Sequence, residues 1–248
     1  MRLDNKIALV TGGASGFGMG IAETFAREGA RVVIADINEK AAREVAASIS
    51  NRTVAVKCDV SQRADVDAAV KATLDGFGGI DILVNNAGMS HVRRPMLEVE
   101  EAEFERLFDV NVKSIFLFAH AVIPHMRKAG SGVIINIGST AGIRPRPGLT
   151  WYNASKGAVN LLSKSMAAEL AGDGIRVCAI APVMAETPLL PTFMGGDSPE
   201  LRAQFKATVP LGRFATIVDV ANAALFLASE EASFLTGNVL EVDGGRCV

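Results

Sequence analysis

The chain has 248 residues and a formal net charge of −2, with 49% hydrophobic and 21% charged residues. This length supports one hydrophobic core, so we expect one α/β domain over residues 1–248. Charges of both signs are spread along the chain and leave no basic surface for nucleic acid, and the longest apolar runs are too short to cross a bilayer. The N-terminus carries no signal-peptide pattern, which favours a cytoplasmic protein with no membrane partner.

The metal-ligating residue types are few and scattered. Cys58, Cys178 and Cys247 are odd in number and widely separated, and the three histidines have no partner spacing for zinc. We therefore expect free thiols and no metal site.

Short β-branched runs alternate along the chain with longer segments of helical periodicity. The expected strands are 7–10, 31–35, 53–58, 80–85, 132–137, 175–180 and 238–242. The expected helices include 18–28, 39–49, 64–77 and 159–170. Strand runs that are apolar on both faces require helices on both sides. The pattern predicts a Rossmann-type, doubly wound parallel sheet of seven strands.

A glycine-rich turn follows the first expected strand, with the sequence Thr11-Gly-Gly-Ala-Ser-Gly-Phe-Gly18. Strand, turn and helix in this order present backbone N–H groups to an anion. A P-loop needs Lys and Ser/Thr next, but Met19-Gly20 follows, and the G-x-G-x-x-G spacing does not fit either. The spacing still suits a tight turn at Gly12, close approach to a pyrophosphate at Gly16 and helix packing at Gly18. Taken alone, such a turn also fits a purely packing role.

An acidic residue, Asp36, ends the second expected strand 24 positions beyond Gly12. A carboxylate there binds the adenosine ribose hydroxyls of NAD. No Arg or Lys lies directly beside Asp36 to neutralise a 2′-phosphate. The sequence therefore favours NAD over NADP.

Tyr152 and Lys156 lie four residues apart at the start of a helical segment, so they share one face. A neighbouring ammonium favours the phenolate and brings a tyrosine toward general acid/base work. The alternative is a surface tyrosine that happens to lie beside a lysine.

Together with the glycine turn, this pair resembles the short-chain dehydrogenase/reductase family, over essentially the whole chain. Further motifs of the family stand at matching places: Asp59-Val60, Asn85-Asn-Ala-Gly88, Asn111, Ser139 and Val242-Asp-Gly-Gly245. Read alone, Ser139 also fits turn chemistry, and Asn111 also fits a structural polar residue.

The resemblance implies four catalytic residues. Ser139 would polarise the substrate oxygen, Tyr152 would exchange a proton with it, and Lys156 would bind the nicotinamide ribose and lower the Tyr152 pKa. Asn111, in a helix, would hold a water that links Lys156 to solvent. The implied cofactor-binding residues are Gly12, Ser15, Gly16, Phe17, Gly18, Asp36, Asp59, Val60, Asn86, Ala87, Gly88, Tyr152, Lys156, Pro182, Val183 and Thr187. The resemblance also implies a homotetramer with interfaces near residues 100–128 and 152–171.

One position departs from the family pattern, because Val183 stands where the family usually has Gly. This puts in question the backbone path beside the nicotinamide. The proline-rich stretch that follows predicts a long substrate-binding loop over about 183–211.

The substrate is the least determined part. Residues 188–194, Trp151 and Ile143 are candidates for an apolar wall, and a core-packing role is equally available. The loop arginines are Arg93, Arg94, Arg144 and Arg146. They would either attract an acidic substrate or stay solvated.

We expect an NAD-dependent oxidoreductase that interconverts a secondary alcohol and a ketone, on a mainly apolar, aromatic or alicyclic substrate. The alternatives are a 3-oxoacyl-thioester reductase, a sugar dehydrogenase, or a non-catalytic dinucleotide-binding sensor.

Overall fold

The computed structural model describes residues 1–50 and 52–248, in which seven parallel strands form one sheet. The order is β3-β2-β1-β4-β5-β6-β7. The bounds are β1 Ile7–Thr11, β2 Arg31–Asp36, β3 Thr53–Lys57, β4 Ile82–Asn85, β5 Gly132–Ile137, β6 Ile175–Pro182 and β7 Val239–Val242. The chain reverses its direction of winding between β1 and β4, and open α/β sheets bind ligands at the carboxyl end of such a switch point.

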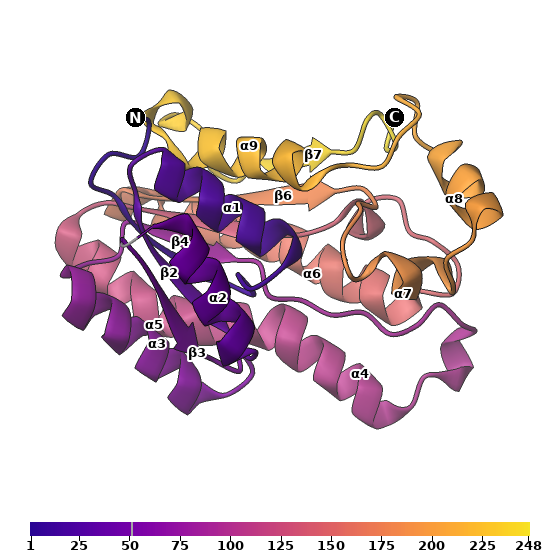
Figure 1. Ribbon diagram of the computed structural model, residues 1–248, viewed down its shortest axis with the longest axis horizontal. Helices are drawn as coiled ribbons and strands as arrows, with labels where there is room; N and C mark the ends of the chain where they lie inside the picture. Colours follow the sequence, from indigo (N-terminus) through magenta and orange to yellow (C-terminus); the bar gives the residue numbers. More distant parts are fainter. Residues whose placement is uncertain (51) are drawn as a thin grey trace.

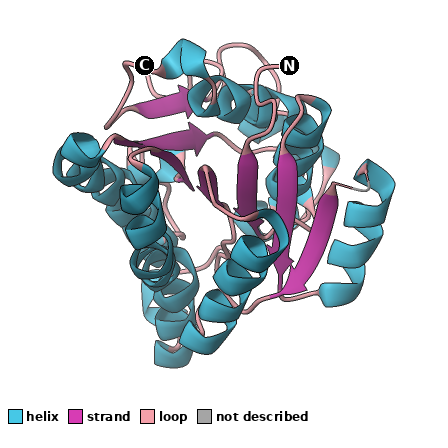
Figure 2. Ribbon diagram, turned by 90° about the vertical axis from the view of Figure 1, so that its left-hand side faces the viewer, coloured by secondary structure: helices cyan, strands magenta, loops and turns pink. Residues whose placement is uncertain are grey.

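Helices cover both faces of the sheet (Figure 2). One layer holds α1 (Gly16–Arg27), α2 (Glu39–Ile49) and α9 (Ile217–Ala228), and the other holds α3 (Arg63–Phe77), α5 (Ser114–Ala129) and α6 (Thr150–Leu170). In β1, Ala8 and Val10 pack with the first layer and Leu9 with the second. Side chains alternate across a strand, so a strand covered on both sides is apolar throughout. The predicted fold class is confirmed.

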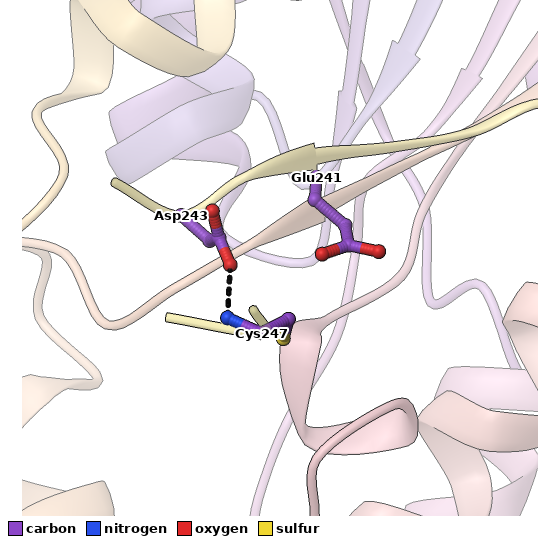
Figure 3. A group of neighbouring side chains, drawn as sticks. All are labelled: Glu241, Asp243 and Cys247. Carbon is purple, nitrogen blue, oxygen red and sulfur yellow. Dashed lines mark hydrogen bonds between the residues drawn. The ribbon is translucent and has the colours of Figure 1, made fainter. Parts of the chain in front are cut away.

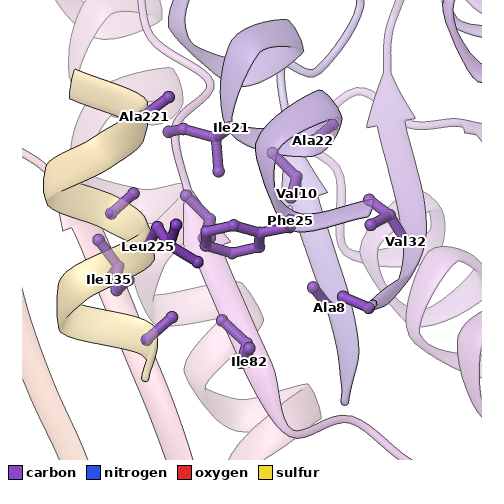
Figure 4. Close-up of a cluster of buried hydrophobic side chains, with 14 of the residues drawn as sticks. Ala8, Val10, Ile21, Ala22, Phe25, Val32, Ile82, Ile135, Ala221 and Leu225 are labelled. Atoms are coloured by element: carbon purple, nitrogen blue, oxygen red, sulfur yellow. The ribbon is translucent and has the colours of Figure 1, made fainter. Parts of the chain in front are cut away.

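The first helix layer is anchored by Phe25, which is fully buried between α1, α9 and the sheet (Figure 4). The two helices approach closely at Gly20, where an added Cβ would lie 2.0 Å from Ile217 Cγ2. A glycine is therefore required at this helix crossing.

A continuous helical stretch runs through α4 (Glu101–Phe108), a π-helical segment Asp109–Lys113 and α5. Residues 101–129 are long and apolar enough, by length and composition, to cross a membrane, which the short apolar runs of the sequence did not suggest. In this fold α5 packs on the sheet and on α3, and Phe118 and Val122 on it are fully buried. We therefore interpret the stretch as a core helix.

The segment after β6 is not the long loop that its prolines predicted. It contains two short helices, α7 (Leu190–Met194) and α8 (Pro199–Lys206), at the end of the sheet toward which β6 and β7 point (Figure 1). Pro191 and Pro199 lie in the first turn of each helix, where no N–H donor is needed. Leu190 and Met194 are buried against Met184, so α7 is packed onto the end of β6.

Candidate active site

The glycine turn leaves β1 with two left-handed residues, Gly12 at φ +62° and Gly16 at φ +53°. A Cβ on Gly12 would lie 2.8 Å from Ala87 Cα, and one on Gly18 would lie 2.2 Å from the Gly12 oxygen. A Cβ on Gly16 would only reach ordinary contact with Thr187, at 3.6 Å, so its φ and not a clash favours glycine there. Gly12 and Gly18 therefore permit close packing, and Gly16 permits the left-handed turn at the start of α1.

The beginning of α1 is arranged to receive an anion. Ser15 is the N-cap, and its side chain makes no capping hydrogen bond. The first N–H groups of a helix have no intrahelical partner and attract negative charge. This open helix start fits a pyrophosphate.

Asn86 holds the glycine turn in place. Its Nδ2 donates to the carbonyls of Thr11 at 2.9 Å and Gly12 at 3.0 Å. The Thr11 hydroxyl in turn accepts from the backbone N–H groups of Asn86 and Ala87 at 3.0 Å. The Asn86 amide is thus engaged in positioning the turn.

Two carboxylates lie on the rim beyond the turn. Asp36 accepts from the backbone N–H of Ala14 at 3.0 Å and of Asn38 at 2.9 Å. Asp59 accepts from the Ser61 hydroxyl at 2.6 Å and from Arg106 Nη2 at 3.4 Å. Burial works against ionisation of Asp59, but these hydrogen bonds outweigh it and lower the pKa of Asp59.

Tyr152 projects from the first turn of α6, which begins at Thr150, so the helical segment expected at Tyr152 and Lys156 is continuous with the expected helix 159–170. Burial raises the pKa of Tyr152 to about 12, against the opposing influence of the Ser139 hydroxyl and the Arg146 charge. Its ring lies 5.0 Å from that of Phe193. At neutral pH the phenol therefore keeps its proton.

Lys156 follows one turn later, and its Nζ donates to the Ile137 carbonyl at 2.7 Å. Burial lowers the pKa of Lys156 to about 8. The expected lowering of the Tyr152 pKa by Lys156 is not found here, because desolvation dominates both groups and the neighbours that act on Tyr152 are Ser139 and Arg146.

Asn111 lies in the π-helical segment, not in a regular α-helix. Its amide donates to the Met89 carbonyl at 2.9 Å and to Ser155 Oγ at 3.0 Å, and its Oδ1 accepts from Met89 N at 2.9 Å. Ser155 is one helical position before Lys156, so Asn111 braces α6 against the loop after β4. The expected water-holding role stays a prediction.

Val183 takes the place of the usual glycine without backbone strain. In the described chain, Asn5 is the only non-glycine residue with positive φ. Val183 N donates to the Val242 carbonyl at 3.1 Å, and its side chain packs against Phe17. The backbone at Val183, which the sequence left in question, therefore follows directly from β6 without strain.

Nearly all the expected residues line one cleft of about 420 Å³ at the carboxyl end of the sheet. It runs from the glycine turn past Asp36 and Asp59 to Ser139, Tyr152 and Thr187. Gly18 and Asn111 do not line it and lie behind the residues that they support.

Known proteins are similar to this chain in fold and in sequence. Residues 12–246 match the family model described as enoyl-(acyl carrier protein) reductase. The 4-formylbenzenesulfonate dehydrogenase TsaC1/TsaC2 of Comamonas testosteroni is 47% identical, with 99% of each chain covered. The 2-(R)-hydroxypropyl-CoM dehydrogenase of Xanthobacter autotrophicus is 42% identical over 97% of this chain and 98% of its own. A crystal structure of 3-ketoacyl-(acyl-carrier-protein) reductase from Brucella melitensis complexed with NADH superposes with a TM-score of 0.95 at 47% identity, covering 99% of this chain and 100% of that one.

The chain belongs to the short-chain dehydrogenase/reductase family. The resemblance drawn from the glycine turn and the Tyr152–Lys156 pair is thereby confirmed.

The substrate end of this family member's cleft differs from the sequence expectation. Trp151 and Ile143 do not line it, since Trp151 packs edge-on against Phe104 and donates to the Met96 carbonyl, and Ile143 is exposed. Pro188, Leu189 and Phe193 do line it, as expected for the apolar stretch 188–194. The cleft also includes residues that the sequence did not single out, among them Met89, Arg106, Ala141 and Leu149, and Arg146 was named only as a loop arginine.

One group of metal-ligand types gathers within the described residues, away from the cleft. The ligand atoms of Glu241, Asp243 and Cys247 lie within 4.8 Å of one another (Figure 3). Asp243 already accepts from the backbone N–H of Gly245 at 2.8 Å and of Cys247 at 2.7 Å. Burial raises the pKa of Cys247 to about 11, which favours the thiol over the thiolate that a metal binds. Asp243 therefore serves to fold the C-terminal turn.

Proposed function

We propose that the protein is an NAD-dependent oxidoreductase that interconverts a secondary alcohol and a ketone by hydride transfer. The observation that carries this proposal is the convergence of Ser139, Tyr152 and Lys156 in the cleft that begins at the glycine turn. The relatives that are dehydrogenases of alcohols and aldehydes support it.

The cofactor is proposed from the shape and charge of the cleft. A bound nicotinamide dinucleotide would supply or accept the hydride. The start of α1 would hold its pyrophosphate, Asp59 and Val60 would meet the adenine, and Pro182, Val183 and Thr187 would lie along the nicotinamide end. Asp36 favours NAD, because a 2′-phosphate beside this carboxylate would meet like charge. The NADH in the related Brucella structure supports a nicotinamide dinucleotide.

The side chains supply positioning and a proton. In the direction of reduction, Ser139 and Tyr152 donate hydrogen bonds to the carbonyl oxygen while its carbon receives the hydride. Tyr152 then gives its proton to the developing alkoxide. A pKa of about 12 keeps Tyr152 in the acid form that this direction needs. Lys156 would hold the nicotinamide ribose, and the Ser139 hydroxyl and the Arg146 charge favour the phenolate that remains.

The walls of the cleft favour an aromatic or alicyclic substrate. Leu149, Met184, Leu189 and Phe193 line the cleft together with Tyr152 and offer apolar surface, and Leu149 and Phe193 pack in one cluster with Tyr152. A 3-oxoacyl-thioester reductase is the second candidate, supported by the related structure of that name. Its thioester substrate would extend out of the cleft past the two short helices.

We further propose a single dinucleotide-binding domain with a substrate segment at about 183–211, in a cytoplasmic homotetramer. The outer faces of α5 and α6 support the assembly, because Phe116 is 56% exposed and Leu161 is 69% exposed. Light scattering after gel filtration measures the mass that tests it.

The proposal is tested with a panel of secondary alcohols and ketones, assayed with NAD(H) and with NADP(H). We expect preference for NAD(H), and a loss of kcat of at least about 100-fold in Tyr152→Phe. Binding of NADH by the variant, followed by fluorescence, serves as the control for folding. Full activity of Tyr152→Phe would remove the proposed mechanism, and preference for NADP(H) would remove the role given to Asp36.

A further inference from the structure

Arg146 is the one arginine from the loop between β5 and α6 that enters the cleft. Its guanidinium lies over the ring of Phe205 on α8, with Cζ 5.3 Å from the ring centre. Its Nη1 is buried and has no hydrogen-bond partner among the described residues. A hydrogen-bond donor buried in this way is costly to leave unsatisfied.

The charges and the burial around Arg146 add to the cost of leaving its Nη1 without a partner. Burial, helped by the like charges of Arg246 and Arg93 and opposed by Tyr152 and Cys247, lowers the pKa of Arg146 to about 10. It therefore remains a cation at neutral pH. Nε and Nη1 of Arg246 are likewise buried without a partner among the described residues.

The other three loop arginines have protein partners. Arg93 Nε donates to the Pro147 carbonyl at 3.3 Å, Arg94 forms an ion pair with Glu103, and Arg144 Nη1 donates to the Arg246 carbonyl at 2.6 Å. Arg146 is in no ion pair among the described residues, and no carboxylate is among the groups that most affect its pKa. A half-buried cation among like charges is stabilised when an anion joins it.

Arg146 also lies within reach of the reacting groups. It lines the same cleft as Ser139 and Tyr152, and its charge counters the effect of burial on the pKa of Tyr152. The apolar side chains of Leu149 and Phe193 line the cleft with it. A substrate of moderate size would contact apolar wall, proton donor and cation at once.

We propose that Arg146 binds a carboxylate or sulfonate on the substrate, so that the substrate is an anionic ketone or secondary alcohol with an apolar body. This inference rests on the proposed function and names its substrate class. It replaces the expectation of a mainly apolar substrate, and it assigns to Arg146 the acid-attracting role that the sequence left open for all four loop arginines.

The test compares three ketones of one shape: 4-acetylbenzoate, 4-acetylbenzenesulfonate and the neutral 4-methylacetophenone. For the wild type we expect a higher kcat/KM on the two anions, through a lower KM. In Arg146→Gln the ratio of kcat/KM for anion over neutral ketone falls about 10- to 100-fold, the range of one charge-assisted hydrogen bond. Arg146→Lys recovers part of this ratio, and added salt lowers it in the wild type.

Arg127→Gln is the matched control, because it removes the same charge from an exposed ion pair with Asp173 at the C-terminal end of α5. We expect the anion preference of this variant to equal that of the wild type. Should Arg146→Gln lose its thermal transition, Arg146→Lys and the salt series carry the test.

Calorimetric binding of 4-acetylbenzoate to the NADH-loaded protein separates the two proposals. Binding that depends on Arg146 without turnover of any ketone would support the anion site and remove the proposed function. Turnover of all three ketones with no anion preference would overturn the anion site alone. An equal loss on charged and neutral ketones in Arg146→Gln, with a shifted pH profile, would also overturn it, because Arg146 would then act through Tyr152.

Discussion

Burial of the Lys156 ammonium predicts that this residue destabilises the folded protein. The pKa of Lys156 falls from 10.5 to about 8 through desolvation. At about 1.36 kcal/mol for each pKa unit, this fall corresponds to about 3 kcal/mol at neutral pH. Replacement by Met removes the charge and keeps a similar length.

The net gain is smaller, because Lys156→Met also removes the hydrogen bond to the Ile137 carbonyl. An unsatisfied buried carbonyl costs about 1 kcal/mol or more. We therefore expect the variant to have a free energy of unfolding about 2 kcal/mol higher than the wild type at pH 7, together with loss of catalytic activity.

The pH dependence gives the sharper measurement. Between about pH 8 and 10.5 the unfolded chain holds the Lys156 proton and the folded chain releases it, so wild-type stability gains with rising pH. Burial raises the pKa of Cys58 and Tyr152 to about 12, which acts in the opposite direction in both proteins. The difference between variant and wild type isolates Lys156, and we expect it to shrink as pH rises from 8 to 10.

The assay is urea unfolding of the cofactor-free protein at pH 7, 8, 9 and 10. Lys164→Met, an exposed lysine two turns further along α6, is the control and should give no pH-dependent difference. A less stable Lys156→Met at pH 7, or a difference that does not change with pH, would refute the claim that the Lys156 charge is destabilising.

Two further predictions concern packing. In Gly18→Ala the new Cβ would meet the Gly12 oxygen at 2.2 Å, so we expect NADH affinity to fall at least about 10-fold and stability to fall by about 1–3 kcal/mol, measured by fluorescence titration and urea unfolding. Gly76→Ala, whose Cβ has open space, should instead gain up to about 1 kcal/mol, and an equal effect of both changes would contradict the clash. In Phe25→Ala we expect a loss of about 3–5 kcal/mol in urea unfolding, whereas Phe234→Ala, at a fully exposed side chain, should lose less than about 1 kcal/mol. A loss below about 1 kcal/mol for Phe25→Ala would show that α9 does not depend on this ring.

The sheet could be predicted from sequence because its strands are buried on both faces and read as short apolar runs. The start of α6 was indicated by another signal. Its first two turns carry the buried polar residues Tyr152, Ser155 and Lys156, which interrupt the apolar stripe of an ordinary core helix. Apolar periodicity alone therefore indicated only 159–170, and the four-residue spacing of Tyr152 and Lys156 was what predicted the helix before it.

The cofactor end of the cleft was predictable and the substrate end was not, for a related reason. Close backbone contacts leave no space for a Cβ at Gly12 and Gly18, so both positions can be recognised in the sequence as glycines. Arg146 has no such signal in the sequence. An arginine in a proline-rich loop looks the same whether it is solvated or packed, and only the structure shows that Phe205 packs beside it. The two helices after β6 were not predicted, because a proline in a sequence usually indicates a break in regular structure. Here Pro191 and Pro199 each lie in the first turn of a helix.

The contact between α1 and α9 has a consequence for synthesis on the ribosome. The helix that opens the cofactor cleft packs through Gly20 and Phe25 against residues 217–228, from the opposite end of the chain. A nascent chain that stops before Ile217 leaves the apolar face of α1 uncovered, even though β1 to β6 have all been made. The helix at the cofactor cleft is therefore fully packed only once residues 217–228 have been made, and shorter chains expose apolar surface of the kind that leads to aggregation.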